Sequence, residues 1–116
     1  QCNNAFIFPG LGLGIIACGA TRVTDYMLIQ AACALADCSP LLHDPSGALL
    51  PSFKASQLVS KSVALAVAKA ACEEGVARLT DETQYASRIE ALFWQPGYLP
   101  YRLSSHPVGS ESKDGY

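Results

Sequence analysis

An apolar segment near the start of the chain, residues 5–20, carries no charged side chain and is interrupted by Pro9 and four glycines. This segment constrains the fold most, because an element that is apolar on every side must be buried on every side. Residues 5–8 are aromatic-rich and stop at Pro9-Gly10, which predicts a short buried strand of the kind found in parallel sheets. Residues 11–20, if helical, must be covered all round, and their glycines would allow close approach to neighbouring backbone.

The same segment is too interrupted to cross a membrane, which requires roughly 18 or more continuous apolar residues. It also lacks the basic start of a secretion signal, so we expect no export. The formal net charge of −2, with no basic run, offers no electrostatic footprint for nucleic acid or an anionic membrane. We therefore expect neither of these partners, and a cytoplasmic location, or the mitochondrial matrix in a eukaryote.

The five cysteines are scattered, with no Cys-x-x-Cys pair and no histidine placed to complete a zinc site. Free cysteines without such clustering usually behave as small buried apolar side chains. We expect inert thiols in a reducing compartment.

Two long helices are predicted from capping residues and spacing. Thr24 is a good N-cap for a helix that runs to about Asp37. Its predicted core-facing stripe is Leu28, Ala31, Ala32 and Leu35. A second helix runs from about residue 56 to residue 74, with Gly75 as its C-terminal cap. Its main stripe is Val59, Val63, Ala66, Val67 and Ala70, while Leu58 and Leu65 lie off that stripe and predict cover on more than one side.

A third helix follows an extended link at residues 76–79. Thr80-Asp81-Glu82 offers its N-cap and acidic first turn, and Pro96-Gly97 ends it. The predicted apolar face is Tyr85, Ile89, Leu92 and Phe93. Residues 104–116 are polar and predict a flexible tail.

The chain begins at Gln1 and its only methionine is Met27, which favours a piece of a longer protein. Three or four helices and one short strand also leave apolar elements without enough cover. Exposing a few hundred square ångströms of apolar surface would cost several kcal/mol at about 25 cal/mol per Å². We expect neighbouring strands to come from residues outside this sequence.

Gly12, Gly14 and Ala17 fit G-x-G-x-x-A, the fingerprint of a dinucleotide-binding loop. In the functional interpretation, a pyrophosphate would bind the free amides at a helix start. The fingerprint also requires a second strand that ends in Asp or Glu about 20 residues on, and none is predicted. We therefore favour helix packing through glycine, with a free-standing nucleotide binder as a weaker alternative.

Asn3-Asn4 is the other candidate binding element, because amide side chains can donate to a carboxylate or carboxamide without carrying charge. Considered alone, such a pair is more often turn chemistry. The remaining polar and aromatic residues are expected to have structural roles and no part in binding. We expect His43 and His106 on the solvated surface, and the Lys61 and Lys69 ammonium groups in solvent at the edge of a helix. Trp94, with Phe93, Tyr98 and Tyr101, is expected to pack in the core or at a subunit contact.

The stretch from Gln1 to Gly14 closely resembles the Q-x-N-N-x-x-x-F-P-G-x-x-L-G segment of malic enzymes. The likeness covers about residues 1–103, and its further segments follow in the same order: Arg22-Val23-Thr24-Asp25, Leu50-Pro51, Val59-Ser60, residues 64–69, Gly75-Val76-Ala77, and Phe93-Trp94 with Tyr98 and Tyr101.

The resemblance implies that Asn3 matches an asparagine that hydrogen-bonds a malate carboxylate, and that Asn4 matches its neighbour near substrate and nicotinamide. It implies NAD or NADP as hydride acceptor and a bound Mg or Mn. The family's general base, general acid, metal ligands and phosphate-binding loop lie in upstream segments, so we assign no catalytic, metal or cofactor-binding residue in this chain.

The predicted fold class is α/β, as the C-terminal part of a Rossmann-like NAD(P)-binding domain. This part is mostly helical, with one short buried strand near the N-terminus, and it spans residues 1–103 before the 104–116 tail. We expect the chain to be part of an enzyme that oxidatively decarboxylates malate to pyruvate and CO2 with reduction of NAD(P). The chain alone is expected to be inactive. Its expected partners are malate, the remainder of the malic enzyme chain and further copies in a homo-oligomer. The alternative is a small helical interaction or oligomerisation module, in which Asn3 has no role.

Overall fold

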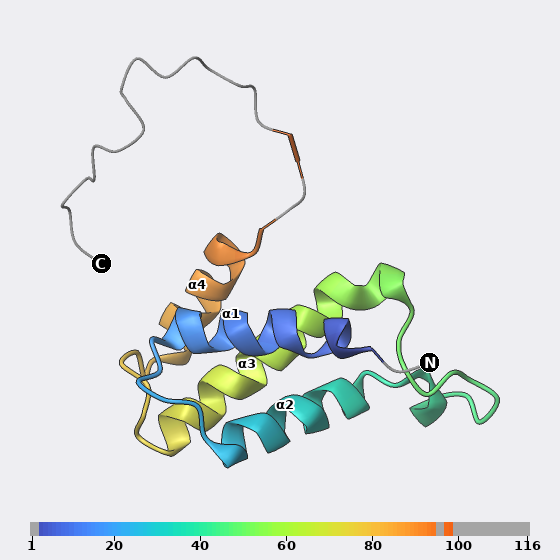
Figure 1. Ribbon diagram of the computed structural model, residues 1–116, viewed down its shortest axis with the longest axis horizontal. Coiled ribbons are helices and arrows are strands. Elements are labelled where there is room, and N and C mark those ends of the chain that lie inside the picture. Colours follow the sequence, from blue (N-terminus) through green and yellow to red (C-terminus); the bar gives the residue numbers. More distant parts are fainter. Residues whose placement is uncertain (1–2, 95–96, 99–116) are drawn as a thin grey trace.

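Helices account for all the regular structure in the part of the chain that the computed structural model describes, residues 3–94 and 97–98. The α-helices are α1 (Phe8–Cys18), α2 (Asp25–Asp37), α3 (Ser56–Glu73) and α4 (Glu82–Leu92). Three short 3-10 helices accompany them: η1 (Asn4–Phe6), η2 (Pro40–Leu42) and η3 (Phe53–Ala55). α3 lies at the centre of the arrangement and contacts α1, α2 and α4 (Figure 1).

The predicted strand at residues 5–8 is wrong, because these residues form η1 and the start of α1. The Asn3 side chain accepts a hydrogen bond from the Ala5 backbone N–H at 2.9 Å and so caps η1. Pro9 lies in the first turn of α1, where its missing N–H costs nothing and its fixed φ suits a helix. Pro9-Gly10 therefore begins a helix instead of ending a strand, and only the mostly helical part of the predicted fold class is confirmed.

Two glycines of α1 allow it to lie very close to α3. A Cβ at Gly10 would lie 2.6 Å from the Ser60 carbonyl oxygen, and one at Gly14 would lie 2.5 Å from the Ala64 carbonyl oxygen. Close packing through Gly14 confirms the prediction, whereas Gly12 points to open space with no atom within 4 Å. The described residues do not cover α1 all round, since Phe8 and Ile16 on its outer face are 58% and 61% exposed.

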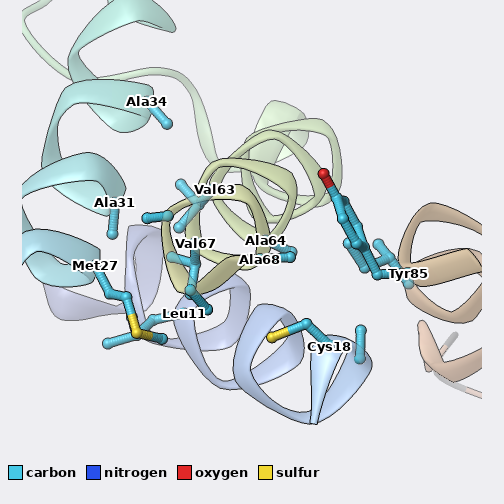
Figure 2. Close-up of a cluster of buried hydrophobic side chains, with 14 of the residues drawn as sticks. Leu11, Cys18, Met27, Ala31, Ala34, Val63, Ala64, Val67, Ala68 and Tyr85 are labelled. Carbon is cyan, nitrogen blue, oxygen red and sulfur yellow. The ribbon is translucent and has the colours of Figure 1, made fainter. Parts of the chain in front are cut away.

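The core is built around α3, whose buried residues are small or β-branched. They are Val59, Ser60, Val63, Ala64, Val67, Ala68, Ala70 and Ala71. Figure 2 shows Val63 and Val67 on the side of α3 that faces Met27 and Ala31 of α2, with Tyr85 on the opposite side. The prediction that α3 is covered on several sides is confirmed, but Leu58 and Leu65 remain exposed.

α2 has the predicted bounds but buries a different face. The Thr24 hydroxyl accepts the Met27 backbone N–H at 3.2 Å, which confirms the N-cap. The buried residues are Met27, Ala31 and Ala34, whereas Leu28 and Ala32 of the predicted stripe are exposed. The sequence of α2 is apolar around most of its circumference, so two overlapping stripes fit the helical period and spacing alone selected the wrong one.

The link from α3 to α4 runs beside the end of α1. Gly75 has φ +67, the left-handed conformation that ends a helix, as predicted. The backbone N–H groups of Arg78 and Leu79 both donate to the Cys18 carbonyl, at 3.1 and 3.0 Å. In α4, Asp81 is the N-cap, and the predicted core positions Tyr85 and Ile89 are buried. Leu92 is exposed, and Pro96 of the predicted stop lies outside the described residues.

Candidate functional site: a hollow beside Asn3

A hollow of about 410 Å³ opens beside Asn3, one of the two asparagines predicted to touch substrate. Its lining comes from two parts of the chain: Asn3 and Phe6 at the N-terminal end, and Ala48, Leu49, Leu50, Pro51 and Phe53 from the segment that leads into α3. A volume of this size falls in the range of small-molecule sites, roughly 300–1,000 Å³. The Asn3 side chain is exposed beside this hollow and is not buried away from any cleft.

The Asn3 side-chain oxygen is engaged by the fold, and among the described residues its amino group has no hydrogen-bond partner. Its oxygen accepts the Ala5 N–H, which fixes the side chain at the N-cap of η1. Because an amide offers an acceptor oxygen and two donor N–H groups, the cap leaves the amino group available to an acceptor such as a carboxylate. Asn4 is exposed in the first position of η1. A contact of either residue with substrate stays a prediction.

The second lining segment of the hollow, residues 48–53, is held by hydrogen bonds that the sequence did not reveal. Ser39, which is buried, donates from its hydroxyl to the Leu49 carbonyl at 2.6 Å and accepts the Leu41 N–H at 3.3 Å. The Phe6 and Phe53 rings meet edge to face, with centroids 5.6 Å apart. Nothing in the sequence around Ser39 predicts this role. The apolar Leu49-Leu50-Pro51 triplet inside a loop was the signal that could have indicated a lining segment.

The other predicted polar and aromatic candidates do not assemble a site among the residues described. His43 is exposed next to η2, and Lys69 is exposed on α3. Lys61 is not a free cation, because its ammonium group pairs with Glu90 at 2.5 Å and lies 5.0 Å from the centre of the Phe93 ring. Trp94 and Tyr98 are exposed, whereas Tyr101 and His106 lie outside the described residues, as does the tail at 104–116.

The acidic pair at the end of α3 serves packing. Tyr26 donates from its hydroxyl to the Glu73 carboxylate at 2.9 Å, and the Thr24 hydroxyl donates to Glu74. The Glu73 hydrogen bond, followed by the negative charge of Glu73, raises the pKa of Tyr26. These bonds tie the start of α2 to the end of α3.

Across residues 3–94 and 97–98, no group of three or more His, Cys, Asp or Glu side chains could hold a metal ion.

The described cysteines fit the prediction of unreactive thiols in two cases. Burial raises the pKa of both Cys18 and Cys72, which disfavours the thiolate that reacts and binds metals. The Cys72 thiol donates to the Leu79 carbonyl at 3.2 Å. Cys33 is exposed, Cys38 is half-buried, and Cys2 lies outside the described residues.

Comparison with known proteins decides the family. The family model described as "Malic enzyme, NAD binding domain" matches residues 1–72, which is more than half of the chain. The chain belongs to this family. It is 56% identical to the NAD-dependent malic enzyme of Sodalis glossinidius and 53% identical to the NAD-dependent malic enzyme 2 of Photobacterium profundum. Each match covers 90% of this chain and 19% of the relative, so the chain spans about a fifth of the length of these relatives.

Membership of the malic enzyme NAD-binding family agrees with the resemblance carried by the first 14 residues, but the glycine motif at Gly12 and Gly14 does not present free amides to a nucleotide phosphate. Gly12 and Gly14 lie inside α1, where each N–H bonds a carbonyl four residues earlier. Gly14 is also pressed against Ala64. We therefore assign no NAD-binding step to this glycine motif.

None of the described helices has the length and apolar character needed to span a membrane.

Proposed function

We propose that this chain is part of an NAD-dependent malic enzyme, which oxidises malate with NAD as the hydride acceptor and releases CO2 to give pyruvate. The observation that carries the proposal is its identity of 51–56% with proteins named NAD-dependent malic enzyme over 90% of its length. Those names favour NAD over NADP. A requirement for Mg or Mn follows only from the family resemblance, which places the metal ligands in upstream segments.

The role that we propose for this chain is substrate binding through Asn3, with Asn4 beside it. Within the described part of the chain nothing bonds the Asn3 amino group, and its oxygen caps η1, so the fold fixes the direction of the donor before substrate arrives. A neutral donor suits a pocket that must also hold a metal ion and a charged cofactor, because it adds no charge of its own. The hollow next to Asn3 has room for a molecule of the size of malate.

The exposed apolar side chains support a second part of the proposal, that these helices pack against the rest of the enzyme. Phe8 and Ile16 on α1, Ile29 on α2 and Leu58 on α3 are 57–72% exposed in this chain. Large exposed apolar side chains on three helices favour contact with further parts of the protein. We propose residues 1–103 as the part of the NAD-binding domain that closes over strands supplied elsewhere in the polypeptide, and a homo-oligomer as the working state.

The experiment replaces Asn3 in the full-length enzyme that carries this sequence. Asn3→Asp keeps an oxygen that can cap η1 but exchanges the amide donor for a negative charge facing malate. We expect the KM for malate to rise at least tenfold with the fold intact, since a hydrogen bond to a charged group contributes about 1.5–3 kcal/mol. Asn3→Ser, a neutral cap without the amide donor, should raise KM by a similar or smaller factor.

Steady-state kinetics with malate, NAD and Mn, together with circular dichroism, separate binding from folding. If both variants keep the KM of the parent enzyme, the assignment of Asn3 is wrong. The 116-residue chain alone should turn over no malate, because the described residues hold no metal cluster and no assigned catalytic group. Turnover by the chain alone would refute the need for the rest of the enzyme.

A further inference from the structure

The segment that lines the hollow together with Asn3 is held by one buried serine. Ser39 follows α2 and lies ten residues before Leu49, whose carbonyl accepts its hydroxyl at 2.6 Å. Ser39 is only 7% exposed, so water does not compete well for this bond. The bond fixes the segment of residues 48–51 at the point where it becomes the lining of the hollow.

A second serine in the same connection provides a contrast. Ser46 is exposed, and both its N–H and its hydroxyl bond only to Asp44, two residues earlier, at 2.9 and 2.7 Å. Its bonds shape a local turn and reach no residue that lines the hollow. Ser39 and Ser46 therefore differ in what they hold, although both are serines between α2 and α3.

The hollow is apolar except at Asn3 and the backbone. Leu49, Leu50 and Pro51 line the same hollow as Asn3. An apolar wall close to an amide donor limits the water around it, and a hydrogen bond from that donor to a carboxylate gains strength when less water competes. Moving the wall outward would hydrate the amide and weaken the bond without touching the donor itself.

We propose that Ser39 is a positioning residue for substrate: it holds the 48–51 segment against the hollow, so that a dicarboxylic acid bound to the Asn3 amide is shielded from water. This proposal rests on the proposed role of Asn3. Ser39 acts through the Leu49 carbonyl and does not contact the substrate. Its removal lowers the affinity for malate and leaves the chemical step unchanged.

The test compares Ser39→Ala, Ser39→Thr and Ser46→Ala in the full-length enzyme. Ser39→Ala should raise the KM for malate about three- to tenfold, the effect of one net hydrogen bond, with kcat within about twofold. Ser39→Thr keeps the hydroxyl and should restore the KM, and Ser46→Ala should match the parent enzyme. Leu49→Ser, at a side chain 71% exposed, is a second variant that makes the wall polar without emptying the core.

A double variant links the two residues. If Ser39 acts through the Asn3 amide, then adding Ser39→Ala to Asn3→Ser should raise KM by clearly less than the product of the two single effects. An unchanged KM in both Ser39→Ala and Leu49→Ser, while Asn3→Ser raises it, would overturn the role of Ser39 alone. If Ser39→Ala lowers both kcat and the melting temperature without changing KM, the role of Ser39 is refuted. It is also refuted if Ser39→Thr does not restore the KM of the parent enzyme. If Asn3→Ser itself has no effect, the proposed site fails instead.

Discussion

Replacing Gly14 with alanine tests the closest contact between two helices of this fold. The added Cβ would lie 2.5 Å from the Ala64 carbonyl oxygen, 2.9 Å from the Val67 Cβ and 3.1 Å from the Ala64 Cα. Carbon and carbonyl oxygen normally approach no closer than roughly 3.3 Å, so α1 and α3 must separate by most of an ångström. Two of the three blocking atoms belong to backbone, which has no rotamer by which to yield.

The expected magnitude combines two opposing effects. Overpacking of a filled core costs about 1–3 kcal/mol, and the better helix propensity of alanine returns about 1 kcal/mol. We expect Gly14→Ala to lower the free energy of unfolding by about 1–2 kcal/mol. Gly12→Ala is the matched control two residues away: a Cβ there meets nothing within 4 Å, so only the propensity gain remains. The two variants should differ by about 2–3 kcal/mol.

Urea denaturation followed by circular dichroism at 222 nm measures the difference. With an m-value of about 1–2 kcal/mol per molar, the midpoint should fall by roughly 1 M for Gly14→Ala and rise by up to about 1 M for Gly12→Ala. If both substitutions shift the midpoint in the same direction, α1 does not present Gly14 to α3 as described. Equal m-values among the variants would confirm that the comparison reflects stability alone.

Two further predictions concern the core and the start of α4. Met27 is fully buried between α2 and α3, so Met27→Ala should lower the free energy of unfolding by about 2–5 kcal/mol in the same urea assay; a loss below about 1 kcal/mol would contradict its burial. The hydroxyl and N–H of Thr83 donate to the Asp81 carboxylate, and these bonds hold the pKa of Asp81 below the ordinary 3.8. The cap therefore contributes its full stabilisation above pH 3.8, and this stabilisation is lost as the pH falls through the lowered pKa. A carboxyl titration by NMR should give a value under 3.8, and Asp81→Asn should remove this part of the acid dependence; a raised value would refute the cap.

The bounds of α2 and α3 and the start of α4 were predictable because they depend on local chemistry. Thr24, Gly75 and the acidic start of α4 act through hydrogen bonds within a few residues, so the sequence contains the whole cause. The predicted strand failed because a four-residue apolar run fits a strand or a helix equally, and Asn3 and Pro9 favour the helix. The buried face of α2 failed for a related reason: its apolar residues surround the axis, and contact with α3 selects Met27 over Leu28.

In the candidate site, too, some residues could be predicted from the sequence and others could not. Asn3 was singled out because its motif resembles a family segment; it is exposed beside a hollow, and its contact with substrate stays a prediction. Ser39 was not identified, since its partner is the carbonyl of a residue ten positions away and a carbonyl carries no side-chain signal. Contacts made to backbone across a loop depend on the path of that loop, which composition and periodicity do not define.

The central place of α3 determines the order in which this part of the protein can come apart. α3 contacts α1, α2 and α4 and takes part in most of the contacts among the four α-helices, so its loss would remove most of the core. α4 lies at one margin of the group (Figure 1), and it can detach while α1, α2 and α3 stay packed together. Amide hydrogens of α4 are therefore open to solvent exchange through a local fluctuation, whereas those of α3 exchange only when the whole bundle unfolds.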